Sequence, residues 1–283
     1  MGGTWSNSLD LLKSSWRVLR QHKSLVAFPV ISAIATIVLI VALMVPAYLL
    51  TGIRDGEPSN SFLFYVLFFV FYFVCSFIVI FFNTGLIACA REALRGGDPD
   101  FAYGFDMARK NIGKIAGWAL VSATVGMILK AIRERGGLIG QIAASLIGFA
   151  WNLVVFFVIP VFLFQGFGVI DSIRESASLF RKTWGENMIA RFSLGIIFFF
   201  LGLVAVIPIT LAVMSRNLAV IIGATGLALM YWTVLAIVSS SLTGILAAAL
   251  YQYAISGMVP EAYNQHSITG AFQPKPQRRF GMR

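Results

Sequence analysis

The hydrophobic residues of this 283-residue chain gather into long apolar runs, and shorter segments of mixed polarity lie between the runs. A run of about 20 apolar residues is long enough to cross the hydrocarbon core of a bilayer as a helix. We therefore predict an all-α, polytopic membrane protein with six transmembrane helices. The expected spans are 25–51, 62–90, 115–132, 138–165, 188–214 and 227–257.

The last apolar stretch, 217–258, is long for a single crossing. If it were wholly helical, its 42 residues would measure about 63 Å, against a hydrocarbon core of about 30 Å. The glycines of Gly223–Gly226 predict a break between a short outer segment and one long span. Two full spans joined near Ser239–Ser241 are the alternative, although no proline or glycine marks a turn there.

Three shorter segments, near 9–19, 101–112 and 173–184, carry apolar residues at the three- and four-residue spacing of an amphipathic helix. Basic residues with aromatic neighbours suit a helix that lies in the headgroup layer. We predict three cytoplasmic amphipathic interfacial helices; packing of these helices against one another as a small cap is the alternative. The residues expected to face lipid are Leu12, Trp16, Leu19, Phe101, Phe105, Ile112, Ile173, Phe180 and Trp184.

Each amphipathic segment leads directly into a pair of spans. We therefore expect a single transmembrane domain over 1–257, with pseudo-repeats at about 8–90, 100–165 and 168–257. Three prolines and a basic end predict that 258–283 is a disordered cytoplasmic tail. This tail is expected either to be solvated or to approach an anionic leaflet through Lys275, Arg278, Arg279 and Arg283.

Composition supports the membrane assignment, because 58% of the residues are hydrophobic and 12% are charged. Six spans place both termini on one side, which would carry 17 of the 22 Lys and Arg residues and 9 of the 12 Asp and Glu residues. The positive-inside rule makes that side cytoplasmic and predicts a multi-pass protein of the inner membrane. The exceptions are Lys130, Arg133 and Arg135, which would lie outside. The net charge of +10 favours anionic lipids as partners, and no nucleic acid is expected.

The sequence offers little for catalysis. His22 and His266 are the two histidines, the deep parts of the spans contain no ionisable residue, and no phosphate-binding glycine loop is present. We expect neither an enzyme nor a bound metal or cofactor, and ion-coupled transport is disfavoured. Asn152 is the best polar candidate within a span, with an interhelical hydrogen bond as the competing interpretation. Pro160 and Pro208 predict kinks in the fourth and fifth spans, so these three residues mark a candidate pathway.

Small residues recur every four positions along the last span. They form a ridge that permits close helix approach and is expected to serve helix packing, within the chain or between copies. The residues of this ridge are Ala236, Ser240, Gly244 and Ala248.

Three stretches carry a resemblance: "SLDLLKSSWRVLRQHKSLVAFPVIS", "FFNTGLIACAREALRGGDPDFAYGF" and "FVIPVFLFQGFGVIDSIRESASLFRKTWGEN". They resemble recurring elements of a family of uncharacterised prokaryotic six-span membrane proteins. That family is in turn similar to the membrane domain of some bacterial glycerophosphodiester phosphodiesterases. The resemblance covers about 8–257 and implies the six-span fold with no established activity. The catalytic barrel of those phosphodiesterases is not found in this sequence, so their activity is not expected.

From these features we expect a non-enzymatic membrane scaffold or organiser. Its partners would be lipids and either a second copy of the chain or another membrane protein. The alternative is a channel or uncoupled transporter with a pathway near the kinked fourth and fifth spans.

Overall fold

The structure is a computed structural model that describes residues 2–51, 61–184 and 193–263, and every regular element within these ranges is a helix. The predicted start of the fifth span and the tail beyond residue 263 lie outside the described residues. The helices are α1 Gly2–Gln21, α2 Ser24–Thr51, α3 Ser61–Leu94, α4 Phe101–Lys110, α5 Ile112–Arg135, α6 Gly137–Val154, α7 Val158–Phe164, α8 Val169–Trp184, α9 Ser193–Val204, α10 Val206–Met214 and α11 Leu218–Ser256.

Six stretches within the described ranges are long and apolar enough to cross a membrane, which confirms the all-helical class and fits a multi-pass membrane protein. These stretches are Ser24–Leu43, Val66–Leu94, Ile112–Arg135, Gly137–Phe164, Ile197–Met214 and Leu218–Ser256.

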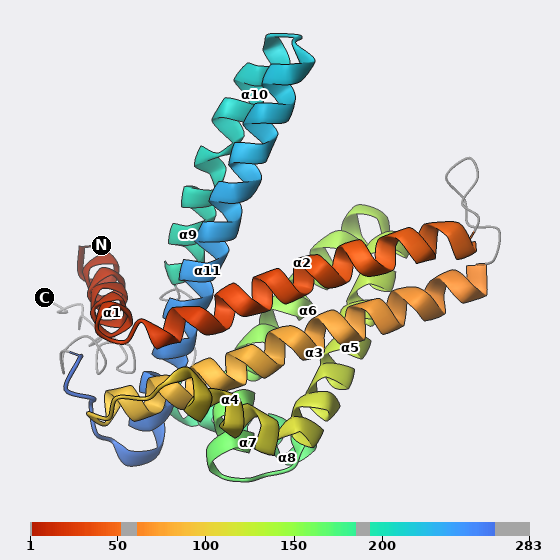
Figure 1. Ribbon diagram of the computed structural model, residues 1–283. Coiled ribbons are helices and arrows are strands. Elements are labelled where there is room, and N and C mark those ends of the chain that lie inside the picture. Colours follow the sequence, from red (N-terminus) through yellow and green to blue (C-terminus); the bar gives the residue numbers. More distant parts are fainter. Residues whose placement is uncertain (1, 52–60, 185–192, 264–283) are drawn as a thin grey trace, which may run out of the picture.

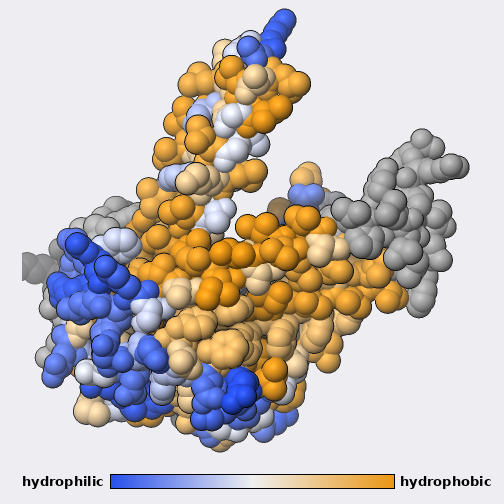
Figure 2. Space-filling view, in the orientation of Figure 1, coloured by the Kyte–Doolittle hydropathy of each residue, from blue (hydrophilic) through white to orange (hydrophobic). Residues whose placement is uncertain are grey.

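The spans pair into three hairpins that meet at a common base; the first and second pack on each other through α3 and α5, and the third extends away from both (Figure 1). The first hairpin is α2–α3, the second is α5 with α6–α7, and the third is α9–α10 with α11. At the base, the returning helices α3, α7 and α11 contact one another. Their buried side chains form the core: Leu86, Ile87, Phe157, Val161, Phe162, Ile245, Leu246 and Leu250. Hydrophilic residues gather around this base, whereas the diverging arms are largely hydrophobic (Figure 2).

Two spans are interrupted close to their prolines. The helix of the fourth span stops between α6 and α7 at 155–157, and that of the fifth span stops between α9 and α10 at Ala205. Pro160 and Pro208 have no N–H to donate to the carbonyl four residues earlier, and their rings crowd that carbonyl. The kinks predicted at these two positions are therefore present as breaks.

The last span has no break. α11 is one helix of 39 residues, so the turn expected at Gly223–Gly226 is wrong, and so is the alternative of two spans joined near Ser239–Ser241. An isolated glycine costs a helix only about 1 kcal/mol. Unpaired backbone groups in an apolar surrounding cost more, which favours continuing the helix. α11 begins where the side chain of Asn217 accepts from Ala219 N–H, and it ends at Gly257 with φ 68°.

The start of the tail also differs from the prediction. Pro260 and Tyr263 are buried against the base, with Tyr263 5% exposed, whereas Met258 between them and α11 is exposed. A large aromatic ring that docks on the base supplies the apolar contact that the proline-rich composition did not indicate.

Candidate functional site

Three helices with charged surfaces, α1, α4 and α8, surround the base. Each packs on a hairpin other than the one that follows it in the chain. α1 packs on α11 and α9 of the third hairpin, α4 on α3 and α2 of the first, and α8 on α7 and α6 of the second. Among the described residues these three helices make no extensive contact with one another, so the alternative of a self-packed cap is wrong.

α1 docks through small residues and short aliphatic side chains. Its buried residues are Ser14, Ser15, Val18 and Leu19. Leu19 is 5% exposed and belongs to the core, so its expected lipid-facing position is wrong. Leu12 is half-buried against the same core, and Trp16 is 43% exposed. The face that points away from the protein carries the exposed residues Lys13, Trp16, Arg17 and Arg20.

α4 approaches α3 backbone to backbone. A Cβ atom on Gly104 would lie 2.5 Å from Cys89 Sγ and 2.6 Å from the carbonyl oxygen of Gly85, so only glycine fits. Phe101 stacks on Phe28 with ring centroids 4.7 Å apart, which makes it a contact with protein rather than lipid.

Two other residues that were predicted to face lipid lie near this contact and are exposed. Phe105, on α4, is 40% exposed, and Ile112, at the start of α5, is 51% exposed. Their exposure is compatible with the expected contact with lipid, which stays a prediction.

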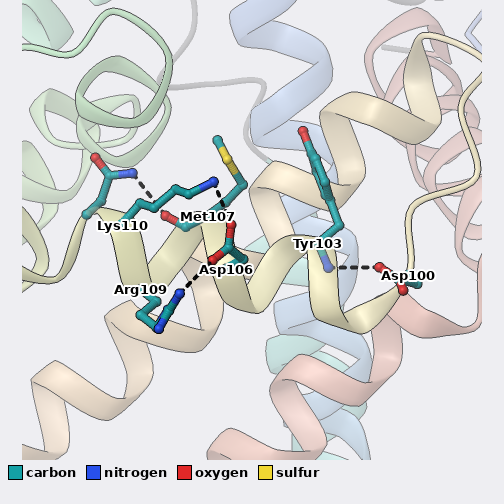
Figure 3. Close-up of polar contacts among 7 residues, drawn as sticks. Asp100, Tyr103, Asp106, Met107, Arg109 and Lys110 are labelled. Carbon is teal, nitrogen blue, oxygen red and sulfur yellow. Dashed lines mark hydrogen bonds and ion pairs between the residues drawn. The ribbon is translucent and has the colours of Figure 1, made fainter.

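The polar side chains of α4 form hydrogen bonds and ion pairs with residues three or four positions away in sequence (Figure 3). The N–H of Tyr103 donates to Asp100 Oδ1 at 2.8 Å, which caps the start of the helix. Asp106 lies between two cations, 2.6 Å from Lys110 Nζ and 3.3 Å from Arg109 Nη2. The hydrogen bond from Lys110, joined by that from Arg109, lowers the pKa of Asp106. Two of the cations of α4 therefore share one carboxylate.

α8 supports the break in the fourth span. Ser176, fully buried, donates from Oγ to the carbonyl of Val154 at 2.5 Å and accepts from the N–H of Phe157 at 3.0 Å. These two backbone groups flank the interruption, where the intrahelical pattern is broken. α8 therefore docks by its serine side, through Ser172, Ser176 and Leu179.

The predicted lipid-facing residues of α8 lie beside this docked side. Ile173 and Phe180 are half-buried and pack against the core. The side chain of Trp184 lies outside the described residues.

A lysine closes the other end of α7. Lys114 Nζ, from the start of α5, donates to the carbonyl of Gly166 at 2.8 Å and to that of Phe162 at 3.2 Å. A cation at this position interacts favourably with the negative end of a helix dipole. The fourth span is thus held at both ends of its short second segment by side chains from other helices.

The two ends of the described chain meet at the base. Tyr263 OH lies 2.7 Å from Ser15 Oγ, and Ser15 Oγ donates to the carbonyl of Leu11 at 2.9 Å. Because the single serine proton is used in that second bond, the tyrosine hydroxyl donates in the first. Burial raises the pKa of Tyr263 well above its ordinary value.

Two cavities lie on either side of the crossing of α3 and α11. The larger, of 720 Å³, is bounded by α3, α5, the break before α7, and α11. The smaller, of 330 Å³, lies between α2, α3 and α11. Both are lined by Val79, Asn83, Ala236 and Ser240.

The small-residue ridge of α11 divides into two parts. Gly244 packs on Leu86, since a Cβ there would lie 2.5 Å from Leu86 Cδ2, and Ala248 is fully buried. Ala236 and Ser240 are exposed and line the cavities. Half of the ridge therefore serves packing within the chain, and the other half borders open space.

The candidate pathway is not assembled. Asn152 is exposed on α6, Pro160 is buried, and Pro208 is exposed on α10. α6–α7 and α9–α10 make no extensive contact with each other, so a pathway between the kinked spans is wrong (Figure 1). Within the described ranges, His, Cys, Asp and Glu form no group of three or more that could hold a metal ion.

Sequence reasoning missed the residues that organise this region. Ser172 and Ser176 sit four residues apart beside the apolar stripe of α8, and small residues at that spacing were a signal for docking on protein. Asn83, which lies in the second half of the predicted span 62–90, borders both cavities, and no sequence pattern indicated this. Lys114 had no sequence signal, because its carbonyl partners lie about 50 residues further along the chain.

Residues 62–260 match a family of unknown function, DUF6159. The chain belongs to this family. Neither the curated proteins nor the solved structures give a match. These comparisons support an uncharacterised membrane-protein family and give no support to the resemblance to the phosphodiesterase membrane domain.

Proposed function

We propose that this member of the family is a non-enzymatic membrane organiser that gathers anionic lipid around its base. The observation that carries the proposal is the outer face of α1, where Lys13, Arg17 and Arg20 flank the exposed ring of Trp16. Tryptophan favours the headgroup level of a bilayer, and each lysine or arginine near an anionic surface adds about 1 kcal/mol of attraction.

The three charged helices differ in how much of their charge is available to lipid. In α4, Arg109 and Lys110 share Asp106, and in α8 Arg174 Nη1 lies 3.5 Å from Asp171 Oδ1. The ion pairs between described residues include none to the three cations of α1. α1 is therefore the helix that we expect to dominate the interaction with anionic lipid.

We propose that the base faces the cytoplasm, because the side with more basic residues is normally retained there. The cations at the opposite end are partly accommodated by neighbours: Lys130 Nζ lies 3.8 Å from the centre of the Phe68 ring and 3.6 Å from Glu134 Oε1. Cysteines introduced at exposed Arg109 and Arg216 test the orientation in sealed right-side-out vesicles. Labelling of Arg216→Cys alone by an impermeant maleimide supports it, and labelling of Arg109→Cys alone contradicts it.

The lipid proposal is tested with a triple variant, Lys13→Gln, Arg17→Gln, Arg20→Gln. The matched control is Lys130→Gln, Arg133→Gln, Arg135→Gln, which removes the same number of charges at the far end of the arms. The readout is the number of phosphatidylglycerol molecules that stay with the protein when it is released from nanodiscs into a mass spectrometer. At about 1 kcal/mol per cation, we expect the α1 variant to weaken this retention by on the order of a hundredfold. Equal loss in the two triple variants, or no loss in either, would contradict the role of α1.

A further inference from the structure

The larger cavity lies within the membrane-spanning part of the molecule and has an unusual lining. Apolar walls come from Ile80, Ile87, Trp118, Phe156 and Ile159. Hydroxyl and amide groups stand among them, on three different helices. These polar residues are Ser76 and Asn83 of α3, Ser122 of α5, and Ser239, Ser240 and Thr243 of α11.

The side chains of these six polar residues make no hydrogen bond to another described residue. None of the side-chain hydrogen bonds found between described residues involves any of the six. Elsewhere in the spans, hydroxyls donate to the carbonyl four residues earlier, as Thr84, Thr124 and Ser241 do. Groups that line a cavity and make no such bond need a partner inside it, because an unmet polar group in an apolar surrounding is costly.

The absence of charged residues from the lining limits which ligands the cavity can bind. The lining contains no Asp, Glu, Lys, Arg or His. A charged ligand would lose its hydration without gaining a counter-ion, so an uncharged molecule is favoured. A volume of 720 Å³ falls within the range of sites that hold a small organic ligand.

The cavity is open at the apolar surface of the arms. Two of its lining residues, Tyr72 and Val79, are 39% and 49% exposed, and Ser240 is exposed as well. A ligand that enters here comes from the hydrocarbon layer that the arms are long and apolar enough to cross. Such a ligand carries an apolar chain for the walls and oxygen atoms for the free hydroxyl and amide groups.

We infer that this cavity is a binding site for an uncharged lipid with a hydroxyl-bearing headgroup, of the diacylglycerol class. Ser122, Thr243 and Asn83 approach the headgroup from three helices, and the aromatic walls contact the chains. The site is separate from the basic face of α1, so it does not rest on the function proposed above, and either can fail without the other.

The first experiment uses the unaltered protein in nanodiscs, with dioleoylglycerol as the probe. Cys75 lines the cavity, whereas Cys89 is fully buried, so N-ethylmaleimide reports on Cys75. Dioleoylglycerol should slow the labelling of Cys75 in a saturable way, and the same fraction of phosphatidylglycerol should not. Equal labelling with and without dioleoylglycerol would mean that this lipid does not occupy the cavity and would overturn the proposal.

The second experiment removes hydrogen-bonding groups while keeping shape. The double variant Asn83→Leu, Thr243→Val should weaken dioleoylglycerol binding about tenfold or more, because each lost bond contributes a few-fold. Thr124→Val is the matched control, since this exposed hydroxyl is bonded to the carbonyl of Leu120 and does not line the cavity. The α1 triple variant should bind dioleoylglycerol like the unaltered protein.

A blocking variant covers the case in which the double variant does not fold. Ser240→Phe places a ring at a residue that is exposed and borders both cavities, so folding is expected to tolerate it. It should abolish the protection of Cys75 by dioleoylglycerol. Protection that persists at full strength in Ser240→Phe would place the lipid elsewhere and overturn the assignment of this site.

Discussion

Ser176 and Lys114 hold the short helix α7 at its two ends. The serine hydroxyl bonds backbone groups on both sides of the 155–157 break, and the lysine ammonium bonds two carbonyls at the other end. In a span that contains a proline, backbone groups freed from the helix must find other partners. Side chains from α8 and α5 supply those partners here, so the break is a supported feature of the fold.

The substitution Ser176→Ala removes both bonds and leaves a buried N–H and a buried carbonyl unpaired. We expect the free energy of unfolding to fall by about 1–3 kcal/mol. Thermal unfolding in detergent micelles measures this effect, with Ser178→Ala as the control because Ser178 is only half-buried on the same helix. Equal melting temperatures for the two variants would show that water or the relaxed backbone replaces the serine.

The substitution Lys114→Met removes the cation at the end of α7 and keeps the length of the side chain. We expect a loss of about 1–2 kcal/mol of stability, from the hydrogen bonds and the helix dipole together. The same unfolding measurement applies. Lys110→Met is the comparison, because its ion pair with Asp106 lies on the surface and is screened by solvent. A larger loss in Lys110→Met than in Lys114→Met would contradict this interpretation.

At the scale of single elements, the charged helices are attached to the base by small residues. Gly104 brings the backbone of α4 against that of α3. In α1 and α8 the small residues buried against the base are serines. The amphipathic periodicity of the sequence predicted that these helices exist. It did not predict which side would dock, because the pattern marks large apolar residues and does not distinguish protein from lipid as their neighbour.

The same limit explains the other errors. Leu19 is as apolar as a lipid-facing residue and is buried in protein, whereas Trp16, three positions earlier, is open. The Gly223–Gly226 segment has the composition of a turn, yet α11 continues through it. In an apolar surrounding, the N–H and carbonyl groups of this segment find hydrogen-bond partners only within the helix itself. The cavity next to Asn83 could not be predicted, since it depends on the angle at which α3 and α11 cross.

The substitution Gly104→Ala should separate α4 from α3. The added methyl group would meet Cys89 Sγ and the carbonyl of Gly85, and overpacking of this kind costs about 1–3 kcal/mol. Maleimide labelling of Cys89, measured in a Cys75→Ser background, should increase from almost none to a measurable rate.

Gly113→Ala, in the following helix α5, is the control for Gly104→Ala, because a Cβ at Gly113 has no atom within 4 Å. It should leave Cys89 unreactive. If Cys89 stays protected in Gly104→Ala as well, the close approach of the two backbones is not what attaches α4.

At the scale of the whole molecule, the first helix and the last described residues are joined by a contact at the base. α1 packs on α11, and Tyr263 donates to Ser15 across 248 positions of sequence. The raised pKa of Tyr263 means that the folded state favours the neutral phenol. The stability that this contact contributes is therefore fully present below the ordinary tyrosine pKa of about 10, and it falls as the pH rises from there towards the raised pKa of the folded state.

We expect limited proteolysis within residues 258–263 to stay slow up to about pH 10 and to become faster at higher pH, because these residues are held by Tyr263. The variant Tyr263→Phe cannot ionise, so its cleavage rate should vary little with pH over that range, apart from the protease's own dependence. A reference substrate that carries the same cleavage site corrects for the protease. The same acceleration in Tyr263→Phe would assign the pH dependence to another group.

The docking of α1 on the third hairpin has a consequence for how the protein is made. α4 and α8 each find their partner hairpin already synthesised, whereas the partner of α1 is synthesised after all the other described helices. At about 5–20 residues per second, the face of α1 that carries Ser14, Ser15, Val18 and Leu19 waits for tens of seconds without its partner. This joint therefore closes only after α11 has been made, and a chain truncated before α11 would present that face to quality-control proteases.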